Sequence, residues 1–149
     1  MLVSLIIPLM VGYLGSLLTD NSVSTWYLNI NKPAFNPPSW VFGPVWTVLF
    51  VLMGLAFYFV WQQGYSPGLL LPWAVYFLQL LFNLLWSFFF FWLRNPLLGL
   101  VDIALLLVLI IINIVLFYRR RRLSGFLLLP YLLWVSFASI LNLAIVIMN

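Results

Sequence analysis

The sequence contains no cysteine and no histidine. Their absence excludes disulfide bonds, the usual zinc sites and the ligation of haem iron by His or Cys. It also excludes the Ser-His-Asp and Cys-His arrangements of nucleophilic catalysis. Asp20 and Asp102 are the only side-chain carboxylic acids, so the chain has little material for paired-carboxylate chemistry. We therefore expect no metal site and no required cofactor.

Charged residues are scarce as well. They make up 5% of the 149 residues, whereas 66% are hydrophobic, and a soluble domain carries roughly 25% charged residues. The composition is therefore typical of an integral membrane protein surrounded by the lipid bilayer. The net charge of +4 does not indicate a nucleic-acid partner, because most of the positive residues form one run at a membrane edge.

The apolar segments are long and do not alternate with polar residues. The run LLLVLIIINIVLF (105–117) is an example, and it favours membrane helices over the alternating strands of a β-barrel. A spanning helix needs about 20 apolar residues. We predict an all-α membrane protein made of a single five-helix domain over residues 1–149, with spans at about 2–19, 39–62, 69–93, 97–118 and 125–147.

The charges predict an orientation in the membrane. An odd number of spans places the N-terminus and Arg119–Arg122 on one side, and Lys32, Arg94 and the C-terminus on the other. By the positive-inside bias, the N-terminus and the arginine run are expected in the cytoplasm. The alternative role of the run is to bind anionic lipid headgroups.

Residues 20–38 form the only long connection, a Pro/Trp-rich loop between the first two spans. It includes most of the stretch WYLNINKPAFNPPSW (26–40). Proline fixes φ, lacks an N–H donor and disfavours helical geometry in the preceding residue. We therefore expect no helix there until after Pro38, and a stiff lid over the bundle mouth with Trp26, Tyr27 and Phe35 at the interface. The alternative is a plain interfacial belt of aromatic residues.

Polar and aromatic side chains recur at helical spacing on three of the spans. Such polar side chains are costly inside a membrane and tend to face the bundle interior. We predict that the three stripes enclose a cavity for a flat apolar ligand; the alternative is that the amides and serines only join helices. The stripes are Trp46, Phe50, Met53 and Phe57 on the second span, Gln79, Asn83 and Trp86 on the third, and Trp134, Ala138 and Asn142 on the fifth.

Asp102 lies about one and a half turns into the fourth span, near the face that carries Arg94. An ion pair between the two side chains lowers the cost of burying both. We interpret them as a structural pair. A proton relay has less support, because no histidine or second acid lies nearby in the sequence.

Residues 26–56 follow the pattern W-Y-x-x-[LI]-x-K-P-x-F-x-P-P-x-W-x-F-x-P-V-W-T-x-L-[FY]-x-x-M-G-x-A. This pattern resembles the translocator protein family, which includes the mitochondrial translocator protein, or peripheral benzodiazepine receptor, and the bacterial tryptophan-rich sensory proteins. The resemblance covers essentially the whole chain, since it continues in QLLFNLLWSFFFF (79–91), at Asp102 and in LPYLLWVSFASILN (129–142).

The resemblance implies a five-helix bundle with an internal pocket that is covered by the first loop. Members bind porphyrins such as protoporphyrin IX and haem, in many cases sterols, and synthetic isoquinoline carboxamides and benzodiazepines. The positions similar to the family's pocket are Trp46, Gln79, Asn83, Trp86, Trp134, Ala138, Leu141 and Asn142. On the lid side they are Trp26, Pro33, Phe35, Pro38 and Trp40.

The chain departs from the animal members at its C-terminal end. Those members carry a cholesterol-recognition pattern on the last helix, whereas the tail LAIVIMN (143–149) has neither tyrosine nor a basic residue. The family's sterol-recognition pattern is therefore missing at that place, and sterol remains an alternative ligand. The short tail and small size resemble bacterial members, so we expect the bacterial cell membrane. The small-residue pair Gly12-x-x-x-Ser16 is a candidate homodimer contact, although such pairs usually join helices of one bundle.

Three functions are compatible with the resemblance. We rank first a membrane receptor or sensor that binds tetrapyrroles, with porphyrin or haem as its ligand. The second is light-dependent porphyrin degradation, in which Trp46 and Trp134 take part. The third is porphyrin or sterol transport, which the odd helix count and the few titratable groups disfavour.

Overall fold

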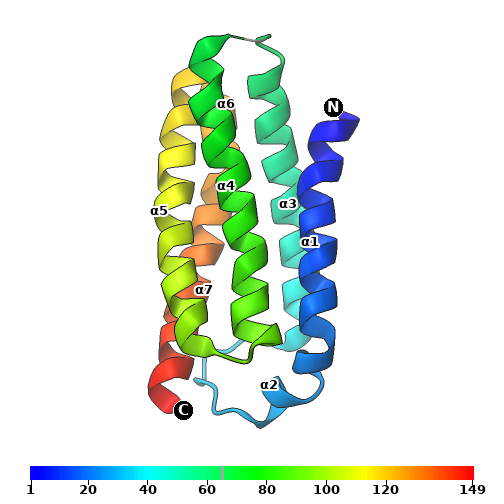
Figure 1. The fold of residues 1–149 in the computed structure, drawn as a ribbon, viewed down its shortest axis with the longest axis vertical. Helices are drawn as coiled ribbons and strands as arrows, with labels where there is room; N and C mark the ends of the chain where they lie inside the picture. Colours follow the sequence, from blue (N-terminus) through cyan, green and yellow to red (C-terminus); the bar gives the residue numbers. More distant parts are fainter. Residues whose placement is uncertain (65) are drawn as a thin grey trace.

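The structure is a computed structural model that describes residues 1–64 and 66–149, and this part of the chain contains helices and no strands. Long helical rods run side by side, with the N-terminus at one end of the bundle and the C-terminus at the other (Figure 1). The elements are α1 (Leu2–Val23), α2 (Trp26–Asn29), α3 (Ser39–Trp61), the 3-10 turn η1 (Pro67–Leu69), α4 (Leu70–Ser87), the π-helical segment η2 (Phe88–Trp92), α5 (Pro96–Arg120), α6 (Arg122–Leu127) and α7 (Leu129–Met148).

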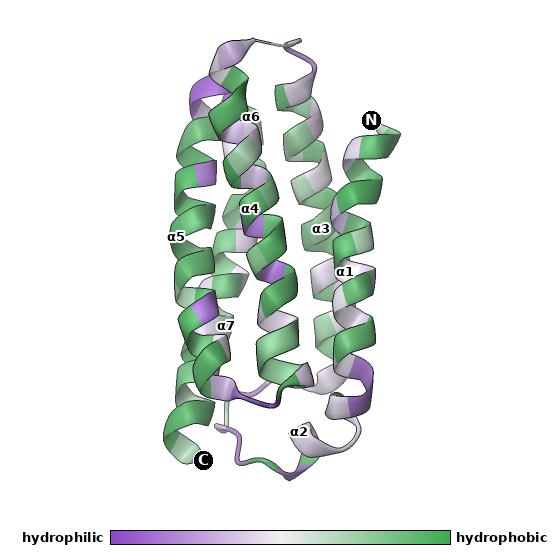
Figure 2. Cartoon of the chain, viewed as in Figure 1, coloured by the Kyte–Doolittle hydropathy of each residue, from purple (hydrophilic) through white to green (hydrophobic). Residues whose placement is uncertain are grey.

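Within the described residues, five rods are long and apolar enough to cross a bilayer. They are Leu2–Val23, Ser39–Trp61, Pro67–Trp92, Pro96–Arg120 and Arg122–Met148. Most of their length is apolar, and hydrophilic residues lie at the ends of the rods, in the α1–α3 connection and at a few positions within α4 and α5 (Figure 2). The prediction of an all-α membrane protein with five candidate spans is confirmed.

Local sequence signals set the limits of α5. Pro96 is its first residue, where the missing N–H costs no helical hydrogen bond. The Asn95 side chain caps the helix, because its Oδ1 accepts a hydrogen bond from the Leu98 N–H at 3.1 Å. α5 ends where Arg121 adopts an extended backbone with φ −150° and ψ 117°. The junction of α5 and α6 lies at the same end of the bundle as the N-terminus (Figure 1).

The connection between α1 and α3 is more helical than the sequence predicted. α1 continues to Val23 rather than ending near residue 19, and Trp26–Asn29 form the single turn α2. Pro33 follows this turn, and a proline clashes with the carbonyl group four residues before it and restricts only its nearest neighbours. The expectation that helix is excluded until after Pro38 is therefore wrong for α2, whereas residues 30–38 have no helix.

α1 and α3 approach each other closely where Gly54 of α3 meets the first turn of α1. Pro8 lies inside α1, and its missing N–H leaves the Ser4 carbonyl without the usual helical donor. A Cβ atom added to Gly54 of α3 would lie only 2.7 Å from that carbonyl oxygen and 2.9 Å from the Leu5 Cα. The glycine therefore permits contact between the two backbones.

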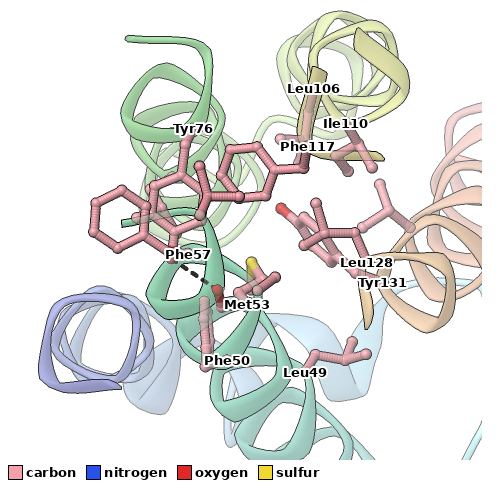
Figure 3. Close-up of a cluster of buried hydrophobic side chains, with 14 of the residues drawn as sticks. Leu49, Phe50, Met53, Phe57, Tyr76, Leu106, Ile110, Phe117, Leu128 and Tyr131 are labelled. Atoms are coloured by element: carbon pink, nitrogen blue, oxygen red, sulfur yellow. Dashed lines mark hydrogen bonds between the residues drawn. The ribbon is translucent and has the colours of Figure 1, made fainter. Parts of the chain in front are cut away.

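The space between α3, α4, α5 and α7 is filled by side chains (Figure 3). The Tyr76 ring stacks on Phe57, with ring centroids 4.6 Å apart, and on Phe117, with centroids 5.6 Å apart. The Tyr76 hydroxyl donates a hydrogen bond to the Met53 carbonyl oxygen at 3.3 Å. The core between these four helices is therefore closely packed at Tyr76.

Candidate ligand cavity

A cavity of about 390 Å³ lies between α1, α3 and α4, and Tyr27 of α2 lines one part of it. Its wall is largely aromatic. The Trp46 ring stacks on Phe50 with centroids 5.5 Å apart, and Trp86 stands nearly perpendicular to Phe91, at 88° and 5.7 Å. The cavity therefore presents flat aromatic surfaces from α3 on one side and from α4 and η2 on the other.

A hydrogen-bonded group lies behind the polar part of the wall. Asn83 lines the cavity, and its Nδ2 donates to the Tyr131 hydroxyl at 3.0 Å. That hydroxyl donates in turn to Gln79 Oε1 at 2.8 Å, and Gln79 Nε2 lies 3.7 Å from Met53 Sδ. The group joins α4 to α7 and to α3, so the position of Asn83 is fixed from behind.

Asn142 acts on the cavity from a distance. It does not line the cavity, but its Oδ1 accepts a hydrogen bond from Trp86 Nε1 at 3.1 Å. Its Nδ2 donates to the Pro96 carbonyl oxygen at 2.8 Å. Asn142 therefore holds the Trp86 indole in place and ties α7 to the start of α5.

The predicted ligand-binding residues separate into three groups. Those that line the cavity are Trp46, Phe50, Asn83 and Trp86. Those that are buried behind it or in the bundle core are Met53, Gln79, Ala138, Leu141 and Asn142. Trp134 borders a different, shallower depression on the outside of the bundle, between α3 and α7. The stripe on the fifth span thus supports the bundle but does not line this cavity.

The α1 face of the cavity was not predicted as part of a site. Gly12, Ser16, Thr19 and Val23 line it, and they share one helical face because they are four, three and four residues apart. Gly12 and Ser16 were expected only to contact another helix, in a second copy or in the same bundle. Gly12 packs so closely that a Cβ atom there would lie 2.5 Å from Phe50 Cε2.

Tyr27 contributes to the cavity from the α1–α3 connection. Its hydroxyl donates to Asn36 Oδ1 at 2.8 Å and so holds residues 30–38 against α2. Burial raises the pKa of the Tyr27 hydroxyl above its ordinary value, and the hydrogen bond to Asn36 opposes this shift. The hydroxyl therefore remains a donor at neutral pH.

Of the predicted lid residues only Tyr27 lines the cavity, and the others, Trp26, Pro33, Phe35, Pro38 and Trp40, do not. Trp26 packs against Phe90 with centroids 5.7 Å apart, and Phe35 packs against Phe137 at 6.3 Å. Trp40 is 75% exposed. Of the two prolines in this set, Pro33 accepts a hydrogen bond from the Asn36 N–H at 3.0 Å, and Pro38 immediately precedes α3.

Two further interactions hold the connection in place. Lys32 Nζ donates to the Tyr27 carbonyl oxygen at 2.6 Å and to the Ile30 carbonyl oxygen at 3.1 Å. Asn31 and Asn149 form a reciprocal pair, in which Asn149 Oδ1 accepts from the Asn31 N–H at 3.0 Å and Asn149 Nδ2 donates to the Asn31 carbonyl oxygen at 2.9 Å. The connection is thus attached to the end of α7.

The expected pair of Asp102 and Arg94 is not formed. Asp102 is 3% exposed, and neither of its oxygens has a hydrogen-bond partner among the described residues. Arg94 is exposed, in the turn between η2 and α5, where its backbone has a left-handed φ of 52°. The guanidinium group can be solvated at the end of the bundle, so it does not need the buried acid.

The sequence of this chain is similar to those of known proteins over most of its length. Residues 4–148 match the sequence model of the TspO/MBR family. A tryptophan-rich protein TspO of Archaeoglobus fulgidus is 46% identical over 146 residues, which cover 98% of this chain and 94% of that protein. A tryptophan-rich sensory protein of Cereibacter sphaeroides is 37% identical over 118 residues, covering 78% and 72%. The translocator protein of Homo sapiens is 34% identical over 132 residues, covering 87% and 78%. The resemblance predicted from the motifs is confirmed, and the chain belongs to the TspO/MBR family.

Proposed function

We propose that this protein is a membrane receptor or sensor that binds a flat tetrapyrrole, such as protoporphyrin IX or haem, in the cavity between α1, α3 and α4. The main support is the pair of indole groups, Trp46 and Trp86, on the walls of a cavity of about 390 Å³. Small-molecule sites measure about 300–1,000 Å³ and combine apolar walls with a few polar groups.

The affinity comes mainly from burying and stacking a large ring. Burial contributes roughly 25 cal/mol per Å² of apolar area, and aromatic contacts add about 0.5–1.5 kcal/mol each. Asn83, Ser16 and Thr19 supply polar atoms on the cavity wall. These atoms orient the polar groups of the ligand rather than providing most of the binding energy.

Quenching of tryptophan fluorescence by the ligand measures this binding. Because the chain has no histidine or cysteine, the usual axial ligands for haem iron are absent. We therefore expect metal-free protoporphyrin IX and hemin to bind with similar affinity. Much tighter binding of hemin would contradict a site that works by stacking and burial.

A matched pair of variants tests the location of the site. Trp46 lines the cavity and Trp134 borders the outer depression. We expect Trp46→Ala to weaken porphyrin binding roughly tenfold, because it removes an aromatic contact together with its buried area. Trp134→Ala also removes one indole but leaves the cavity wall intact, so its affinity should match the parent. Equal losses in both variants would exclude this cavity as the site.

Light-dependent degradation of the porphyrin is the second candidate. It is favoured by the two indoles on the cavity wall, since an excited porphyrin can oxidise a nearby indole and the chemistry belongs largely to the ligand. Illumination of the complex should then bleach the porphyrin absorbance faster in the parent than in Trp46→Phe. Equal rates in both proteins and in detergent alone would leave binding as the only function.

We also propose an orientation in the bacterial cell membrane. The N-terminus and Arg119–Arg122 lie at one end of the bundle (Figure 1). Lys32 and Arg94 belong to the connections at the other end. The excess of arginine favours the cytoplasmic side for the first end by the positive-inside bias.

A further inference from the structure

Asp102 is a carboxylic acid inside a membrane-spanning helix. It lies in α5 and is 3% exposed. No donor among the described residues hydrogen-bonds to Oδ1 or Oδ2. A buried carboxylate is stable only when it is paired or hydrogen-bonded, and ionisable groups at membrane depth are especially costly. The surroundings of Asp102 therefore suit an uncharged carboxylic acid.

No cation among the described residues compensates a negative charge at this position. α5 packs against α3, α4, α6, α7 and η2. The titratable side chains on these elements are Tyr58 on α3, Tyr76 on α4, Arg122 on α6 and Tyr131 on α7, and η2 has none. Arg122 lies at the opposite end of α5 from Asp102, as do Tyr118, Arg119 and Arg120 of α5 itself, and tyrosine is neutral at pH 7. Arg94, the nearest basic residue in the sequence, is exposed.

The packing of the core brings Asp102 close to the group of side chains behind the cavity wall. Asp102 lies one turn before Leu106 on the same face of α5, and Leu106 and Tyr131 belong to one buried cluster. The Tyr131 hydroxyl donates to Gln79 Oε1 at 2.8 Å and accepts from Asn83 Nδ2 at 3.0 Å, and Asn83 lines the cavity. A charge on Asp102 therefore acts on the hydroxyl that holds Asn83 in the wall.

We propose that Asp102 is a proton-binding site in the core of the bundle, and that its protonation is linked through Tyr131 and Asn83 to ligand binding in the cavity. With the proton bound, the Tyr131 hydroxyl donates to Gln79 and Asn83 is held in place. Release of the proton to water leaves a carboxylate. Its charge attracts the Tyr131 hydroxyl hydrogen away from Gln79 Oε1, which loosens the wall at Asn83.

Infrared spectroscopy of the protein in liposomes tests the proton site without any ligand. We expect the C=O stretching band of a protonated carboxyl group at pH 7 in the parent, lost in Asp102→Asn and retained in Asp20→Asn. Asn is nearly isosteric with Asp, and Asp20 is the exposed acid near the end of α1. Absence of the band from the parent at pH 7 would overturn the proposal.

A chemical measurement on the parent protein covers the case in which Asp102→Asn does not fold. Dicyclohexylcarbodiimide, an apolar reagent, reacts with protonated carboxyl groups. Mass spectrometry of the treated protein should find the adduct on the peptide that contains Asp102 at pH 7, with less adduct as the pH is raised. An unmodified Asp102 peptide, or modification that does not depend on pH, would contradict a proton site.

The link between Asp102 protonation and ligand binding rests on the proposed function, and it is measured by a separate experiment. Protoporphyrin titrations at increasing pH should give a rising apparent Kd in the parent and a smaller change in Asp102→Asn, because titration of the porphyrin itself affects both proteins equally. Identical pH profiles would overturn the link. Absence of quenching in both proteins at every pH would contradict the proposed function instead, and the infrared band would still decide the proton site.

Discussion

At the scale of single residues, the Trp86 wall of the cavity depends on Asn142 of α7. Asn142→Leu removes the hydrogen bonds to Trp86 Nε1 and to the Pro96 carbonyl oxygen. Hydrogen bonds between membrane helices are worth about 0.6–2 kcal/mol each. We expect Asn142→Leu to lower the free energy of unfolding by roughly 1–3 kcal/mol, and to weaken porphyrin binding because the indole is no longer held. Thermal unfolding in detergent and quenching titrations measure the two effects.

Asn113 provides a matched control for this prediction. It is a buried amide in α5, but its hydrogen bond to the Pro72 carbonyl oxygen is long, at 3.5 Å. Asn113 does not line the cavity, and the Trp86 indole N–H donates to Asn142 rather than to Asn113. Asn113→Leu should therefore cost less stability and leave the affinity unchanged. If both substitutions weakened binding equally, general loosening of the bundle would explain the effect better than the hold on Trp86.

At the scale of helices, the position of α1 depends on its close approach to α3 at Gly54. A Cβ atom there meets backbone atoms of Ser4 and Leu5 at 2.7–2.9 Å, and backbone cannot turn aside as a side chain can. We expect Gly54→Ala to displace α1 and to lower the free energy of unfolding by about 1–3 kcal/mol, the usual cost of overpacking. Chemical or thermal unfolding in detergent measures this loss.

Gly43 in the same helix gives the control for Gly54. A Cβ atom at Gly43 would have no other atom within 4 Å, and alanine is favoured over glycine in a helix by about 0.5–1 kcal/mol. Gly43→Ala is therefore expected to be neutral or slightly stabilising. Destabilisation by both substitutions would point to a general sensitivity of α3 rather than to the contact with α1.

Helical spacing in the sequence identifies which side chains face inward, but not where the bundle leaves open space. The inward-facing stripes were predictable because amides at helical spacing avoid lipid, and Gln79, Asn83 and Asn142 are buried. The position of the open space was not predictable, because stacking of Tyr76 on Phe57 and Phe117 fills part of the bundle core instead. Such packing depends on helix positions, which spacing along a single helix does not contain.

The α1 side of the cavity was not predicted for the same reason, because spacing along one helix does not reveal how its neighbours are placed. Its small residues indicate that a neighbour comes close, but they do not distinguish a tight helix contact from a cavity wall. At Gly12 the structure has both, since the glycine packs against Phe50 and also lines the cavity. For Asp102, the position within a span predicted its burial, but the sequence did not predict that it lies apart from Arg94.

At the scale of the whole molecule, the two ends of the bundle differ in charge, and we expect them on opposite sides of the membrane. Because the chain has no cysteine, single-cysteine variants can report on each end. Gln62 is exposed at the end of α3 beside the arginine run, and Ser24 is exposed at the opposite end, after α1. In intact cells, a membrane-impermeant maleimide should label Ser24→Cys and spare Gln62→Cys, because the proposed orientation keeps the arginine-rich end in the cytoplasm.

Permeabilised cells supply the control, because both cysteines should then react. Labelling of Gln62→Cys alone in intact cells would show that the orientation is opposite to the proposed one. Labelling of both variants would indicate a mixed population, in which the four arginines do not determine the topology. The orientation also decides how a ligand is encountered. Tyr27 and residues 30–38 lie at the end opposite the arginine run (Figure 1), so the predicted orientation places the α2 side of the cavity toward the outside of the cell.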